Sequence, residues 1–168
     1  MIISRTKVLI TFVVSFLMEP IVSALLGFSY AGPNILLCAS TMLLVLYAES
    51  PLIWGCSILF GIAYDICFSS VVGYTTCGII VCMLGVLLIQ YFLYLDNIFI
   101  VPILAVVDSV LFNLMCWVIS SVQGATYTFG YVLKYTAIDL IGNMVVLLIL
   151  YFILRKHLQK HKSDYKLY

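Results

Sequence analysis

The stretch that decides the fold is VLITFVVSFLMEPIVSALLGF, residues 8–28. It carries one charged residue, Glu19, and a membrane-spanning helix needs about 20 mostly apolar residues. The run is too long for the apolar region of a cleaved signal peptide, so we predict a transmembrane helix. Turn-forming residues follow it at 29–33, where the chain reads Ser-Tyr-Ala-Gly-Pro.

The same pattern continues through the rest of the chain. Of its 168 residues, 65% are apolar and 9% are charged, which excludes an ordinary soluble domain and a disordered chain. We therefore predict an all-α membrane protein with one six-helix transmembrane domain over residues 1–154 and a basic tail over 155–168. The predicted spans cover residues 8–28, 33–48, 52–72, 74–95, 98–122 and 134–154, of which the second is short.

The charges predict how the chain is oriented. Seven of the eight Lys and Arg residues lie near the two ends, and none lies between Val8 and Leu133. Because positive residues flank the cytoplasmic ends of spans, we expect both termini in the cytoplasm. The C-terminal flank would face the cytoplasm or anionic lipid headgroups; its cations include Arg155, Lys156, Lys160 and Lys162. No basic folded face for nucleic acid is present.

Catalytic and metal chemistry finds little support in the sequence. The six cysteines lie in or beside apolar runs and form no Cys-x-x-Cys pair, which argues against a metal site. The two histidines, His157 and His161, lie in the basic tail, and no Ser-His-Asp or Cys-His constellation can be assembled at one membrane depth. We expect a protein that is not an enzyme, with no cofactor and no small-molecule substrate.

Polar residues at membrane depth are the candidate functional positions. Glu19, Asp108 and Asp139 fall within predicted spans, and Asn143 shares a helix face with Asp139. A charge there is expensive, so these side chains should face the bundle interior. They could be protonated, accept hydrogen bonds from neighbouring helices, contact a partner, or form a proton or cation pathway. Pro20 should kink the first helix.

The third span carries a ridge of small and polar residues at steps of four. The ridge consists of Ser57, Gly61, Asp65, Ser69 and Gly73. Small residues mark the places where membrane helices meet, so this face is expected to pack inside the bundle or to dock a partner's transmembrane helix.

The segment around this ridge resembles the signature of the MreD family of rod shape-determining membrane proteins. The family pattern has a Gly four residues before an Asp and another Gly eight residues after it, which Gly61, Asp65 and Gly73 match. Gly55 also fits, and Pro33 with Asn34 resembles the family's entry to a short second helix. The position of Asn143, twelve residues before Arg155-Lys156, agrees as well, so the resemblance extends over nearly the whole chain.

The resemblance implies a place in the bacterial inner membrane beside MreC, a single-span periplasmic scaffold. It implies a complex with the filament MreB, the polymerase RodA and its transpeptidase partner, and a fold similar to the substrate-binding subunits of energy-coupling-factor transporters. We therefore expect a non-catalytic component of cell elongation that binds MreC and supports MreB-guided lateral peptidoglycan synthesis. Two alternatives remain: a vitamin-binding subunit of such a transporter, and a small proton-coupled transporter.

Overall fold

The computed structural model describes a helical protein. It describes residues 5–26, 32–47, 50–69, 71–92, 98, 100–124 and 128–164. Every regular element within these ranges is an α-helix. The helices are α1 (Arg5–Leu26), α2 (Ile35–Tyr47), α3 (Pro51–Phe68), α4 (Tyr74–Phe92), α5 (Ile100–Val122) and α6 (Phe129–Asp164).

Five of the six helices are long and apolar enough to cross a membrane. The exception is α2, whose 13 residues correspond to a length of about 20 Å, against a hydrocarbon thickness of about 30 Å. Large apolar side chains on the outer faces are exposed, among them Leu17 at 55% and Phe152 at 60%, as a lipid-facing surface requires. The chain is thus a multi-pass membrane protein.

Several helix ends differ from the predicted spans. The third helix ends at Phe68, four residues before the predicted limit at residue 72, because Ser69 adopts an extended conformation with φ −97° and ψ 147°. The last helix begins at Phe129 and continues unbroken to Asp164, so most of the predicted tail is helical. No helix-breaking residue separates the apolar part from the basic part. Pro20 lies inside α1, which continues through it.

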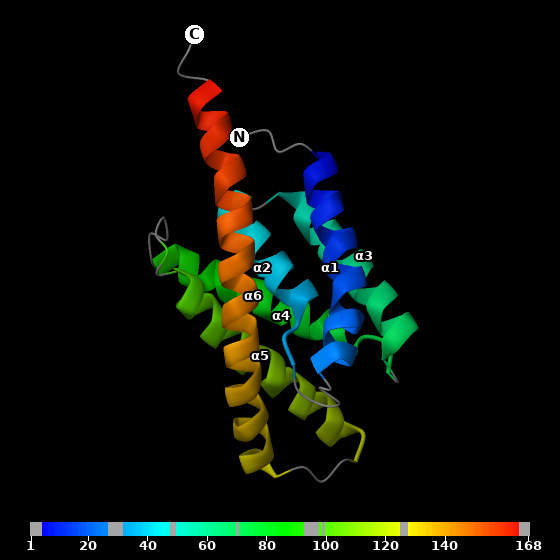
Figure 1. Cartoon of the computed structure of the whole chain (residues 1–168). Coiled ribbons are helices and arrows are strands. Elements are labelled where there is room, and N and C mark those ends of the chain that lie inside the picture. The colour runs from blue at the N-terminus through cyan, green and yellow to red at the C-terminus, as the bar shows by residue number, and fades with distance from the viewer. Residues whose placement is uncertain are drawn as a thin grey trace.

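The short helix α2 is the centre of the bundle. It packs against each of the other five helices, and Figure 1 shows it lying between α1 and α6. Residues 36–44 are all buried, and most of them are apolar. Because protein surrounds α2, its short length does not expose its ends to lipid, and protein side chains must satisfy its terminal backbone groups.

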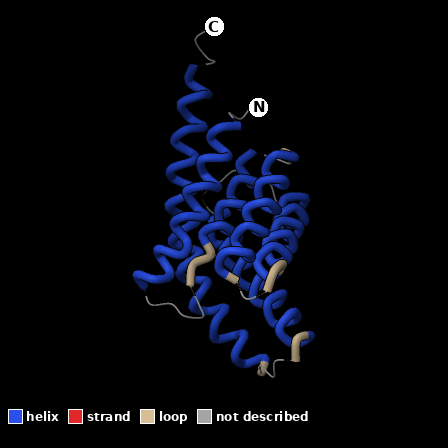
Figure 2. The backbone as a smooth tube through the Cα atoms, turned by 90° about the vertical axis from the view of Figure 1, so that its right-hand side faces the viewer, coloured by secondary structure: helices blue, strands red, loops and turns tan. Residues whose placement is uncertain are grey.

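The first and last helices share one end of the molecule. Figures 1 and 2 show that the start of α1 and the end of α6 lie at the same end, opposite the start of α6. A cluster of aromatic rings attaches α1 to α3, including Phe12 stacked on Phe60 at a centroid distance of 5.7 Å. Phe16 meets Phe60, Tyr64 and Phe68 in the same cluster.

Candidate functional site

Asp65 closes the turn between α3 and α4. Its Oδ2 accepts hydrogen bonds from the N–H of Gly73 at 3.0 Å, the N–H of Thr76 at 3.1 Å and the hydroxyl of Thr76 at 2.7 Å. Its Oδ1 accepts from the N–H of Thr75 at 2.8 Å. The fully buried carboxyl thus caps the first turn of α4, where free N–H groups and the helix dipole favour an acceptor. We call this set of contacts the Asp65 clasp.

Two of the motif glycines make the Asp65 clasp possible. A Cβ at Gly61 would lie 3.1 Å from Oγ1 and 3.3 Å from Cα of Thr76, so only glycine lets α4 approach this closely. Gly73 has a φ of +96°, the left-handed conformation that glycine adopts without strain. By contrast, nothing lies within 4 Å of a Cβ built at Gly55, which is exposed on α3.

A second group of polar side chains holds the start of α2. Asn34 caps the helix, because its Oδ1 accepts from the N–H of Leu37 at 2.9 Å. Asn143 of α6 accepts from the N–H of Asn34, and Glu19 of α1 accepts from the N–H of Leu36, both at 2.9 Å. The cap residue Asn34 and side chains from α1 and α6 therefore supply the acceptors that the buried N-terminus of α2 needs. We call this set the α2 clasp.

Asp139 extends the α2 clasp toward α5. Its Oδ1 accepts from the N–H of Gly32 at 2.9 Å, and its Oδ2 accepts from the amide of Asn113 at 2.8 Å. The amide of Asn143 donates to the hydroxyl of Ser109 at 3.1 Å. These bonds join α5, α6 and the segment before α2, so Asp139 and Asn143 both contact another helix.

The same region brings α6 close to the backbone before α2. Pro33 is buried, and a Cβ built at Gly142 would lie 3.1 Å from the Cβ of Pro33 and 3.2 Å from its nitrogen. Gly142 therefore permits the close approach that places Asp139, three residues before it, and Asn143, the next residue, beside the start of α2.

Asp108 has far fewer partners. Its Oδ2 accepts from the hydroxyl of Thr41 at 2.7 Å, whereas its Oδ1 has no partner among the described residues, although the side chain is fully buried. The hydroxyl of Ser57 is likewise buried without a partner in the described part of the chain. Asp108 and Thr41 join α5 to α2 in the centre of the bundle.

Comparison with known families identifies the chain. Residues 2–161 match the family of the rod shape-determining protein MreD. The chain belongs to the MreD family. Comparison with curated proteins and with solved structures gives no match. Family membership assigns the protein a role in rod shape determination, and it agrees with the multi-pass helical fold.

In this MreD chain, the match to the family pattern pointed to Asp65, the acceptor of the Asp65 clasp, but not to the groups that donate to it. Thr75 and Thr76 follow Gly73 at the start of α4, and a helix start nine residues after a buried acid could have indicated them. Sequence reasoning also did not identify Asn113 and Ser109, which take part in the α2 clasp. They lie four residues apart on α5, a spacing that places them on one face.

The basic flank of this MreD chain is only partly described. Arg155, Lys156, Lys160 and Lys162 belong to α6, but their side chains lie outside the described residues. Of the ridge predicted on the third helix, Ser57, Gly61 and Asp65 are buried, which agrees with a packing face inside the bundle.

Proposed function

We propose that this protein is a non-catalytic component of the bacterial cell-elongation complex, which binds MreC and supports MreB-guided lateral peptidoglycan synthesis. The complex would also contain RodA and its transpeptidase partner. Membership in the MreD family supports this proposal, since that family determines rod shape. The Asp65 clasp is the structural observation that supports the proposal most strongly, because the residues of the family signature form a defined turn there.

The turn closed by the Asp65 clasp is our proposed docking surface for MreC. Apolar side chains around it are exposed, with Ile66 at 66%, Phe68 at 51% and Val72 at 66%. A single-span partner whose helix packs near the membrane surface would bury such side chains. Because Asp65 bonds the backbone of Gly73, the clasp would hold this surface in the conformation that MreC recognises.

The proposed location is the bacterial inner membrane, with both termini in the cytoplasm. The common end of α1 and α6 supports this orientation, as do the cations in the first turn of α1 and the last part of α6. The basic flank would then face MreB filaments or lipid headgroups. We further propose that the six helices are arranged as in the substrate-binding subunits of energy-coupling-factor transporters, with α2 crossing as the short central helix.

Co-purification of MreC tests the proposed docking surface. Gly61→Leu and Asp65→Leu should each reduce the MreC recovered with the full-length protein, while Gly55→Leu serves as the matched control on the same helix. Recovery is normalised to the level of the protein in the membrane. Loss of MreC at normal protein level would support docking at the turn.

Two other results would contradict the proposal. Normal MreC recovery with normal protein levels would remove the docking role, and parallel loss of both would leave the clasp with a purely structural role. A vitamin that copurifies with the solubilised protein would instead support a transporter subunit. Proton-driven uptake in liposomes that Glu19→Gln abolishes would support the small transporter.

A further inference from the structure

An apolar groove lies between α1 and α6. Within the described ranges the two helices do not pack on each other, since α1 packs on α2 and α3 whereas α6 packs on α2 and α5. The groove between them has a volume of about 760 Å³. Val14 and Met18 of α1 form one wall, Val145 and Ile149 of α6 form the other, and Pro33 lies at its base.

The groove opens toward lipid and its walls are hydrocarbon-like. The four wall residues are between 43% and 54% exposed, and in a membrane protein this exposure is to the hydrocarbon region. Its occupant in the bilayer must therefore be apolar over this length, because a polar chain would leave its groups without partners.

The size of the groove favours a slender occupant. Along α6 it extends from Ile138 to Ile153, a length of about 22 Å at the rise of an α-helix. The groove is an open apolar hollow of about 760 Å³ along this length. A single unbranched acyl chain can lie lengthwise in such a hollow.

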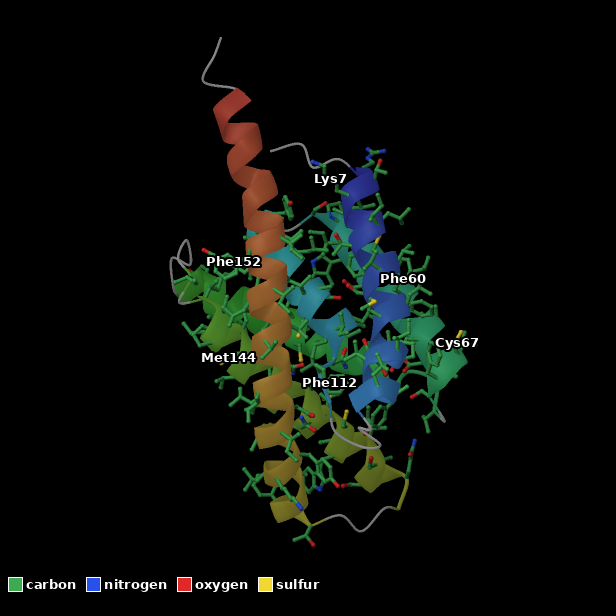
Figure 3. All side chains as sticks on the ribbon, in the orientation of Figure 1. Lys7, Phe60, Cys67, Phe112, Met144 and Phe152 are labelled. Carbon is green, nitrogen blue, oxygen red and sulfur yellow. The ribbon has the colours of Figure 1, made fainter. Side chains whose placement is uncertain are left out.

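A cation lies beyond one end of the groove. A second hollow, of about 300 Å³, adjoins the groove at Ile153, which lines both, and Lys7 and Tyr47 line this second hollow. Lys7 is exposed in the first turn of α1, and Figure 3 shows it at the start of the helix. Arg5 is exposed nearby on the same helix. An apolar channel that ends at cations matches the charge distribution of a lipid with an anionic headgroup.

We propose that the α1–α6 groove binds an acyl chain of an anionic phospholipid, whose phosphate lies at Lys7. The site would hold one lipid at a defined position beside α2. This inference does not depend on the proposed function, since it rests on the groove and on the cation at its end.

Native mass spectrometry of the full-length protein tests the lipid site. The protein is reconstituted with phosphatidylglycerol or phosphatidylcholine, extracted in mild detergent and examined for retained lipid. Wild-type protein should retain one phosphatidylglycerol. Val145→Trp should lose it, because the indole fills the groove, while Leu59→Trp on an exposed face of α3 should retain it. Lys7→Gln should reduce the preference for phosphatidylglycerol about fivefold.

The thermal unfolding temperature of each variant keeps the test interpretable. If Val145→Trp unfolds early, Ile149→Phe replaces it as the groove-filling variant. Equal lipid retention in wild-type and stably folded filled variants would overturn the acyl-chain site, and equal retention of both lipids would overturn the headgroup site. Loss of a single-span protein from the filled variants, with lipid unchanged, would assign the groove to a partner helix instead.

Discussion

Asp65 and Asp108 are both fully buried, but their surroundings differ completely. At the α3–α4 turn, both oxygens of Asp65 accept hydrogen bonds, from three backbone N–H groups and one hydroxyl. Between α2 and α5, Asp108 accepts one bond from Thr41, and its second oxygen has no described partner. Burial alone therefore does not identify an important acid in a membrane bundle; the donors that converge on it do.

An Asp→Asn substitution at each of the two acids should give the largest difference in the free energy of unfolding. Asp65→Asn replaces an acceptor with an NH₂ group that faces N–H donors, so we expect a loss of about 3 kcal/mol in the free energy of unfolding. Asp108→Asn keeps an acceptor for Thr41 and should change stability by less than about 1 kcal/mol. Unfolding by SDS titration in detergent micelles measures both. Equal losses would show that burial, rather than the donor set, decides the effect.

The α2 clasp provides the next largest effect. Asn143→Leu removes the acceptor for the N–H of Asn34 and the donor to Ser109, both of them buried or partly buried contacts. We expect a loss of about 2 kcal/mol, measured by the same titration. Met144→Leu is the control, because Met144 is the next residue along α6 and its side chain is 40% exposed to lipid. If the two variants unfold alike, the α2 clasp adds nothing to stability.

Two glycines of α3 provide a matched pair. Gly61→Ala places a Cβ against the Cα of Thr76 and should cost about 1 kcal/mol, since α4 must shift away. Gly55→Ala meets open space and should stabilise the helix by about 0.5 kcal/mol or more through helix propensity. The thermal unfolding temperatures of the two variants should thus shift in opposite directions. A common direction of change would refute the close approach at Gly61.

The left-handed turn should give the smallest effect. Gly73→Ala is expected to destabilise by about 1 kcal/mol or less, because its φ of +96° is unfavourable for a Cβ although nothing crowds the position. Gly73→Asn should recover part of the loss, since Asn tolerates this conformation better. Melting temperatures of the three proteins test this ranking, and an Asn variant no more stable than the Ala variant would contradict it.

Sequence reasoning predicted the helical membrane class well and the polar contacts incompletely. The long apolar runs of α1 and α5 predict helices directly, because nothing else satisfies backbone groups in lipid. The backbone partners of Glu19 and Asp139 could not be predicted, because they are N–H groups, of Leu36 and Gly32, which almost every residue carries. The prediction placed the end of the last span at residue 154 and did not address the helix beyond it. The helix α6 continues to Asp164, because a change from apolar to basic residues ends a span without ending a helix.

The α2 clasp also has a consequence for the order of synthesis. The backbone N–H of Asn34 donates a hydrogen bond to the side chain of Asn143, which is 109 residues later in the chain. At a synthesis rate of about 5–20 residues per second, this acceptor follows its donor by roughly 5–20 s. During that interval α2 is too short to span the bilayer and has no acceptor from α6. The hydrogen bonds at the N-terminus of α2 therefore remain incomplete until α6 has been synthesised. A chain cut before α6 should therefore be a substrate for membrane quality control, although five of its helices are already made.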